Sequence, residues 1–214
     1  MIHLSHLAGC PAVLRRLSLH DDRAAQLVEF AVSLPLLVVF VVGIFDFSGA
    51  FTLKQKLTNA ARDAARAAAA APISDLSATT PVSVNDAFWI VDNYLIANKI
   101  NDCGIGPSNE TVPGPGSTTW QYAISGSPPS GCPSAGLTIT INRGYYFPAT
   151  AAAQPASVDC ARQAVSTIQT AVISTCVSIQ YGYQWRFGRA ASLLGSTPFL
   201  PSTITAVAVA MNEN

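Results

Sequence analysis

An apolar run at residues 27–45 constrains this chain more than any other feature of its sequence. The run reads LVEFAVSLPLLVVFVVGIF, and Glu29 is its only ionisable residue before Asp46. At a helical rise of ~1.5 Å per residue, such a run matches a hydrocarbon core of ~30 Å. A helix buried in a globular core seldom stays apolar on all sides over this length. We therefore predict a transmembrane helix at residues 25–47.

A cleaved secretory signal is the main rival interpretation, because basic residues precede the apolar run. The run is too long for the apolar region of a signal, and the sequence after it continues as helix. Pro35 is the only proline between Ala24 and Pro72. We expect one helix of up to about 48 residues, with a bend at Pro35, whose missing N–H frees the carbonyl of Ala31.

Residues 48–71 form an alanine-rich extension of this helix. Small apolar side chains recur on one side of it at helical spacing, and polar or charged side chains lie elsewhere on its surface. The first set is Leu53, Leu57, Ala60, Ala61, Ala64, Ala65 and Ala68, and the second is Asn59, Arg62, Asp63 and Arg66. Such an alanine stripe suits a partner helix. It would equally suit packing on the chain's own distal domain, or reflect helix propensity alone.

The distal part, residues 72–214, is predicted to be a small α+β domain. A Ser/Thr-rich linker leads to an amphipathic helix at 84–97, and a second helix is expected at 156–168. Alternation of apolar residues with Thr, Ser or Gln predicts an antiparallel sheet of three or four strands with one covered face. These strands are expected at 118–124, 137–142, 171–185 and 202–210. Gly-, Pro- and Ser-rich sequence predicts loops at 104–116 and 125–136.

Four of the five cysteines, Cys103, Cys132, Cys160 and Cys176, lie in the distal part. Sequence does not choose among their three connectivities, although proximity favours Cys103 with Cys132 and Cys160 with Cys176. The spacings contain no C-x-x-C and the distal part has no histidine, so we predict disulfides rather than a zinc site. Disulfides would place the domain in an oxidising compartment such as a periplasm. Lys and Arg nearly balance across the apolar run, so charge does not set the orientation.

Composition argues against two broad functions. Charged residues make up 11 % of the chain and 12 acids balance 12 bases, so no basic surface indicates nucleic acid as a partner. Without a distal histidine, neither a Ser-His-Asp nor a Cys-His arrangement can form there, and no glycine-rich phosphate cradle lies between a strand and a helix. The distal acids are widely separated. We therefore predict that the chain is not an enzyme and holds no cofactor or metal.

Four short motifs stand in order around the apolar run. They are Arg23-Ala24-Ala25-Gln26-Leu27-Val28-Glu29-Phe30-Ala31-Val32, Leu34-Pro35-Leu36-Leu37, Gly43-Ile44-Phe45-Asp46-Phe47 and Asn59-Ala60-Ala61-Arg62-Asp63-Ala64-Ala65-Arg66. This pattern resembles the TadE-like family, the pseudopilins or minor pilin-like subunits of the bacterial tight-adherence (Flp type IV) pilus. The resemblance is good over residues 23–70 and weak beyond. It implies the lipid bilayer, other pilin-like subunits, pilus assembly proteins and a prepilin peptidase as partners.

In that family a prepilin peptidase cuts after a glycine and leaves a glutamate fifth and an aromatic residue sixth. Cleavage between Ala24 and Ala25 would place Glu29 fifth and Phe30 sixth, although Ala24 stands where the family has glycine. Residues 1–24 would then be a cytoplasmic leader. The resemblance implies that a neighbouring subunit's new α-amino group pairs with Glu29 during assembly. Alternatively, Glu29 lies near enough to the helix end to reach the interface by itself.

Two functions follow as hypotheses. The first is a single-pass inner-membrane protein, N-terminus cytoplasmic and distal domain periplasmic, that serves as a structural subunit or assembly factor of the pilus and assembles through Glu29, Phe30 and Pro35. The second is a membrane-tethered extracytoplasmic binding or adhesion module outside any pilus. Its binding surface would use distal aromatic residues, which could instead pack within the sheet: Trp120, Tyr122, Tyr145, Tyr146, Phe147, Tyr181, Tyr183 and Trp185.

Overall fold

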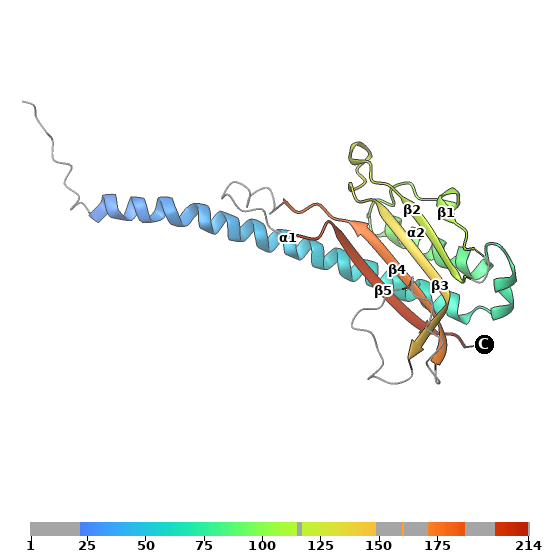
Figure 1. Ribbon diagram of the computed structural model, residues 1–214. Helices are drawn as coiled ribbons and strands as arrows, with labels where there is room; N and C mark the ends of the chain where they lie inside the picture. Colours follow the sequence, from blue (N-terminus) through green and yellow to red (C-terminus); the bar gives the residue numbers. More distant parts are fainter. Residues whose placement is uncertain (1–21, 115–116, 149–159, 161–170, 187–199, 214) are drawn as a thin grey trace, which may run out of the picture. The chain divides into compact units, whose positions relative to one another are not determined.

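The computed structural model describes residues 22–114, 117–148, 160, 171–186 and 200–213, and it has the predicted α+β fold (Figure 1). The helices are α1 (Asp22–Ala70) and α2 (Val82–Ala97), with short 3-10 turns η1 (Ile73–Ser77), η2 (Pro107–Asn109) and η3 (Pro128–Ser130). The strands are β1 (Glu110–Thr111), β2 (Thr119–Ile124), β3 (Leu137–Pro148), β4 (Ala171–Gly182) and β5 (Thr203–Met211). The chain divides into two compact units, Met1–Val41 and Val42–Asn214, and α1 contributes to both.

Helix α1 is a single helix of 49 residues that continues through Pro35. It ends at Ala70, just before Pro72, because a proline disfavours helical backbone in the residue that precedes it. Helix α2 begins after Pro81, which carries no N–H and has extended backbone. Asp75 supplies the missing cap, since its Oδ2 accepts from the Ser83 N–H at 2.9 Å. Both long helices therefore occupy the stretches that the sequence predicts.

The five strands form an antiparallel meander in the order β1-β2-β3-β4-β5. The register pairs Trp120 of β2 with Ile141 of β3, Ile141 with Val177 of β4, and Val177 with Ala208 of β5. All four of these residues are buried. The inward-pointing residues of four strands thus meet in rows on one face of the sheet, as the alternating sequence predicts.

The loop prediction for residues 104–116 is wrong at Glu110–Thr111, which form β1 and give the sheet a fifth strand. The sequence of these two residues shows no strand pattern. The Glu110 side chain helps to hold the strand, because its carboxylate accepts from the Tyr122 hydroxyl at 3.2 Å and from the Thr80 hydroxyl at 2.9 Å. Short 3-10 turns also interrupt the predicted linker and loops. The helix predicted at 156–168 lies outside the described residues.

Two strand ends also differ from the prediction. Strand β3 continues beyond Asn142 to Pro148 after a register shift between Asn142 and Tyr145. Asn142 holds this bulge, since its Oδ1 accepts from the Gly144 N–H at 2.9 Å and from the Thr118 hydroxyl at 3.0 Å. Gly144 is required there, because a Cβ would meet Thr118 Oγ1 at 2.4 Å. Strand β4 ends at Gly182, so Trp185 follows the strand rather than belonging to it.

The core of the second unit lies between the sheet and the helices α1 and α2. The alanine stripe enters this core: Leu57, Ala60, Ala61, Ala64, Ala65 and Ala68 are all buried. They pack in one cluster with Phe88 and Val91 of α2 and Ile139 and Ile179 of the sheet. Of the alternatives left open by the sequence, the structure therefore shows packing on the chain's own distal domain. Small side chains allow the helix backbone to approach the sheet closely.

Further contacts join α1 to the sheet at both ends of the stripe. Lys54 donates a hydrogen bond to the Thr205 carbonyl of β5. At the other end, the buried Arg143 side chain in the β3 bulge donates to the Ala71 carbonyl at 3.0 Å, just beyond the last residue of α1. A cation at this position complements the negative end of the helix dipole. Burial lowers the pKa of Arg143, and the charge of Asp75 partly opposes that effect.

Candidate functional site: the apolar helix and its boundary at Asp46

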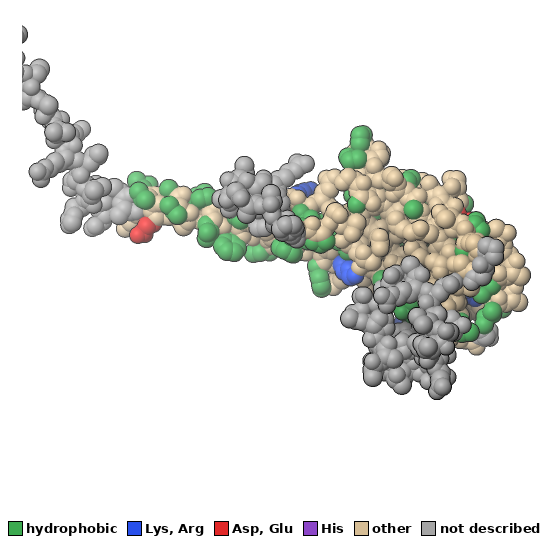
Figure 2. Space-filling model, in the orientation of Figure 1, with side chains coloured by type: hydrophobic (Ala, Val, Ile, Leu, Met, Phe, Trp, Pro, Cys, Tyr) green, Lys and Arg blue, Asp and Glu red, His purple; other side chains and the backbone are tan. Residues whose placement is uncertain are grey.

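The side chains in the apolar half of α1 are exposed. Residues 26–38 are exposed without exception, including Phe30 at 62 % and Pro35. Among the described residues, Gln26–Ala70 is the helix whose length and composition suffice to cross a membrane. In water so much exposed apolar surface is unfavourable, whereas hydrocarbon around it is not. Figure 2 shows hydrophobic side chains along this half of the helix, with one acidic side chain near its start.

Glu29 is exposed among apolar neighbours. Residues Val28, Glu29, Val32, Ser33 and Leu36 line one shallow depression along the helix, so Glu29 lies on a face that is otherwise mostly apolar. Ser33 satisfies its own hydroxyl by donating to the Phe30 carbonyl at 3.3 Å. Ala24 and Ala25 lie within the first turn of α1, where the structure assigns helix to the backbone.

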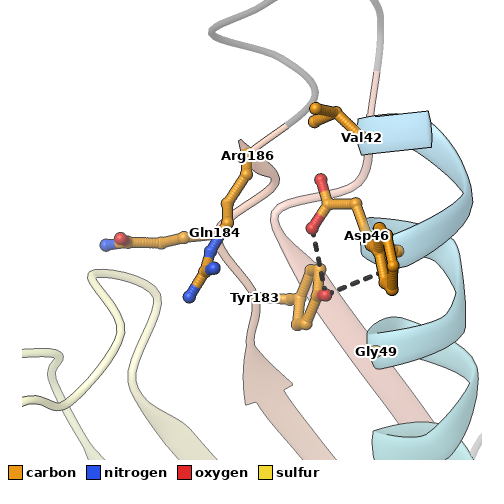
Figure 3. Close-up of a pocket in the computed structure, with 7 residues that line it drawn as sticks. Val42, Asp46, Gly49, Tyr183, Gln184 and Arg186 are labelled. Carbon is orange, nitrogen blue, oxygen red and sulfur yellow. Dashed lines mark hydrogen bonds between the residues drawn. The ribbon is translucent and has the colours of Figure 1, made fainter. Parts of the chain in front are cut away.

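The apolar run ends abruptly at Asp46. Phe45 is 74 % exposed, whereas Asp46 is only 6 % exposed. Asp46 lies on the buried side of α1 with Gly43 and Ala50. The hydroxyl of Tyr183, just after β4, donates to the Asp46 backbone carbonyl at 3.0 Å and lies 3.3 Å from its Oδ1 (Figure 3). Burial raises the pKa of the Tyr183 hydroxyl, as does the Asp46 charge, while Arg186 opposes them. The first carboxylate after the apolar run is therefore anchored to the distal domain.

Gly49, one turn further along α1, makes this contact possible. A Cβ at Gly49 would lie 3.0 Å from the Tyr183 hydroxyl, closer than a Cβ normally approaches. The glycine therefore lets the tyrosine lie against the helix backbone. Sequence reasoning missed this contact, although a glycine inside a long helix is itself a sign of a packing requirement.

Two of the cavities in the described part of the chain lie at this boundary. The first, of about 640 Å³, is lined by Val42, Phe45, Asp46, Gly49, Tyr183, Gln184 and Arg186. The second, of about 660 Å³, includes Phe47, Phe51, Lys54, Trp185 and Pro201 in its walls. Trp185 packs against aromatic residues of both cavities: its ring centroid lies 5.2 Å from that of Phe47 and 4.8 Å from that of Tyr183. Its indole N–H donates to the Pro201 carbonyl at 2.7 Å.

The four distal cysteines form two disulfides, in the pairing that sequence proximity favours. Cys103 bonds to Cys132, and Cys160 bonds to Cys176. The first joins the segment after α2 to the segment before β3. The second lies with Tyr145, Val207 and Val209 in a separate cluster of side chains. Within the described residues, no three His, Cys, Asp or Glu side chains come together as a potential metal site.

The distal aromatic residues are mostly used in packing. Trp120, Tyr122, Tyr145 and Tyr181 are buried, and Tyr122 stacks on Phe88 of α2 with ring centroids 4.3 Å apart. The Trp120 indole donates to the Thr79 carbonyl at 2.9 Å. Tyr183 and Trp185 lie at the α1 boundary, and the side chains of Tyr146 and Phe147 are outside the described set. These four buried residues therefore do not form an aromatic binding surface, as the adhesion hypothesis would require.

A long helix with an exposed apolar half, joined to an α+β domain with two disulfides, is the organisation of a membrane-anchored protein whose domain lies in an oxidising compartment. Comparison with known families gives a match. Residues 24–66 match the model of the family described as TadE-like protein, which confirms the resemblance to that family over this segment. This match supports involvement with the tight-adherence pilus system. Neither curated proteins nor solved structures gave a match.

Proposed function

We propose that this chain is a bitopic membrane protein that acts as a pseudopilin-like structural subunit or assembly factor of a tight-adherence pilus. The observation that carries the proposal is the coincidence of the TadE-like match at residues 24–66 with the exposed apolar half of α1. The match covers the apolar half of α1 and most of the alanine stripe, and it ends before the residues of the sheet. The proposed function therefore centres on the helix.

The proposed organisation follows the sequence boundaries. Residues 1–24 are a cytoplasmic leader, 25–47 span the inner membrane, 48–71 attach the helix to the domain, and 72–214 form the periplasmic domain. The two disulfides support the last assignment, because such bonds persist in oxidising compartments. Packing of the alanine stripe against the chain's own sheet leaves the apolar half of α1 as the part available to neighbouring helices and lipid.

Glu29 is the residue to which we assign subunit recognition. An ionisable group among apolar side chains at membrane depth is costly unless it is paired or reaches the interface. Processing between Ala24 and Ala25 would create an α-amino group four residues before Glu29. Pairing of a neighbour's amine with Glu29 would satisfy both charges and set the relative register of two helices. Phe30 and Pro35 would take part in the packing of the two helices at the same contact.

The adhesion alternative has less support. Its candidate aromatic side chains at Trp120, Tyr122, Tyr145 and Tyr181 are buried in the domain. The proposed structural subunit needs no aromatic binding surface, because it would contact its neighbours through the apolar half of α1. We therefore retain the structural subunit as the proposal.

Replacement of Glu29 by Gln tests the assignment, because Gln keeps the size and hydrogen-bonding capacity but removes the charge. Co-purification of the full-length protein with pilus components should fall, whereas the exposed Asp63→Asn on the same helix should leave it unchanged. Unchanged co-purification of the Glu29→Gln protein would rule out a role for that charge.

Intact mass of the membrane-extracted protein tests processing separately. Loss of residues 1–24 is expected, and an Ala25→Pro variant should keep them by blocking the peptide bond that follows Ala24. A full-length mass in the wild-type protein would exclude cleavage at this bond and favour a plain anchor.

A further inference from the structure

We propose that the membrane-proximal edge of the distal domain lies in the headgroup layer of the bilayer, because the lipid-facing surface of α1 continues past Asp46 to Phe51. The proposal extends the span at residues 25–47 by about one helical turn. It rests on the membrane orientation proposed above but not on incorporation into a pilus. The lipid-facing surface consists of Ile44, Phe45, Phe47 and Phe51 of α1 and the adjoining segment 200–205.

Asp46 does not mark the level at which the exposed apolar surface ends. In the sequence it is the first charged residue after the apolar run, but in the structure it is 6 % exposed and contacts Tyr183 of the domain. A carboxylate turned into the protein does not report how deeply the opposite side of the helix lies in a bilayer. The exposed side chains around it carry that information instead.

The exposed side chains of α1 stay apolar for more than one turn past the end of the apolar run. Phe45 is 74 % exposed, Phe47 54 % and Phe51 65 %. Three exposed phenylalanines this close together are unfavourable in water but not in lipid. The exposed Thr52 donates its hydroxyl hydrogen to the Ser48 carbonyl at 2.9 Å. Its hydroxyl is therefore satisfied within the helix, without water.

Charge on the exposed side of α1 begins again only at Lys54. Between Glu29 and Lys54, the exposed residues of the helix carry no charge. The stretch 30–53 is roughly 36 Å long at ~1.5 Å per residue, whereas the hydrocarbon core is ~30 Å thick. A tilt of roughly 30–35° accommodates this difference and lies within the range of membrane helices. Lys54 would then reach the phosphates at the end of the lipid-facing surface.

An edge of the domain lies beside this end of the lipid-facing surface. Phe51, Lys54, Pro201 and Thr203 line one cavity, and Lys54 donates a hydrogen bond to the carbonyl of Thr205. The segment 200–205 reads LPSTIT, without a charged residue, and its Pro201 side chain is exposed. Because it carries no acidic side chain, this edge can enter a layer of lipid phosphates without charge repulsion.

A helix of a neighbouring subunit is the other candidate to cover the exposed phenylalanines. The spread of the exposed side chains favours lipid. From Phe47 through Ile44 to Phe45 they cover roughly 160° of the helix surface at 3.6 residues per turn. One partner helix buries a narrower seam, whereas lipid surrounds the whole exposed arc. The surface also continues that of residues 26–38, which are all exposed.

Spin-label accessibility tests the depth of Phe51. The full-length protein with Cys10→Ser is reconstituted at low density into vesicles of ethanolamine and glycerol phospholipids. A nitroxide is attached through Phe40→Cys, Phe51→Cys or Arg62→Cys, all at exposed positions of α1. Oxygen, which concentrates in lipid, should relax the labels at positions 40 and 51 more than a water-soluble nickel chelate does. The chelate should be the more effective reagent at position 62, which is the matched control.

Each other outcome is decisive. Nickel accessibility at position 51 equal to that at position 62 would overturn the proposal and leave the boundary at Asp46. Low accessibility of position 51 to both reagents would also overturn it, because a protein contact would then shield the label. A label at position 40 that is accessible to the nickel chelate would instead refute the membrane span on which the proposed function rests.

A nickel-chelating lipid, which holds the metal at the headgroups, tests the domain edge. It should broaden the signal of a label at Ser202→Cys but not at Asp86→Cys, an exposed position of α2. Phe51→Asp should abolish the broadening at position 202, because the charge lifts this edge out of the layer. Gln55→Asp, one turn further along α1, should preserve it. A label at position 202 that is not broadened, or broadening that persists in Phe51→Asp, would contradict the proposal.

Discussion

Replacement of Leu57 by Ala tests whether the alanine stripe belongs to the chain's own core. Leu57 is fully buried, at 0 % exposed, in one cluster with other stripe residues and the inward side chains of the sheet. Truncation of a buried leucine to alanine removes transfer free energy and leaves a cavity, which together cost about 3 kcal/mol or more. For a domain of this size, each kcal/mol lowers Tm by about 2–4 °C. We therefore expect a decrease of about 6–12 °C.

The measurement is thermal unfolding of the full-length protein in detergent, followed by near-ultraviolet circular dichroism of the distal aromatic residues. Phe51→Ala on the same helix is the control, because Phe51 is 65 % exposed and its truncation should change stability by under ~0.5 kcal/mol. If the stripe served a partner helix instead, the purified monomer would lose little stability in Leu57→Ala. A Tm within 2 °C of the wild-type value, by the same scale, would refute intramolecular packing.

Two further perturbations address the distal domain. Cys103→Ser with Cys132→Ser should lower stability by about 3–4 kcal/mol in the chain-entropy model for a separation of 29 residues, and Cys160→Ser with Cys176→Ser by about 3 kcal/mol for 16; Tm and the mass change on alkylation measure both. Asp92 is buried, and that burial, followed by the charge of Asp102, raises its pKa above 3.8. The fold therefore loses stability as pH rises through the raised pKa, so Asp92→Asn should be more stable than wild type at pH 7 and lose this advantage near pH 3.8. If Asp92→Asn differed from wild type in stability by the same amount at pH 7 and at pH 3.8, the assignment would be contradicted. Asp86→Asn, at an exposed position of the same helix, is the control.

The elements best predicted from sequence are those with a long, regular pattern. Helix α1 has no proline besides Pro35 before Pro72, and strand β5 alternates apolar and polar positions over its length. Strand β1 has two residues, too few for any period, and depends on the side-chain contacts of Glu110. The extension of β3 was hidden because the bulge at Arg143-Gly144 interrupts the alternation that identifies strands.

The candidate site was less predictable, because it depends on contacts between distant residues. Glu29 stands out in the sequence, since one charge within an apolar run is chemically conspicuous. The contact of Asp46 with Tyr183 joins residues 137 positions apart, and no local pattern encodes it. Gly49 and the aromatic pair Tyr183 and Trp185 were visible separately, but only the fold places them together.

The alanine stripe shows why such a pattern cannot be assigned from one helix alone. Small residues allow close approach to any flat partner, whether a helix of another subunit or the sheet of the same chain. Here the sheet and α2 bury the stripe, so the TadE-like segment performs two physical tasks. Its alanine-rich end attaches the helix to the domain, while its apolar end keeps exposed side chains for lipid and neighbouring helices. Substitutions in the alanine-rich end should therefore lower the stability of the domain. Substitutions at Glu29 should weaken assembly without lowering the stability of the domain.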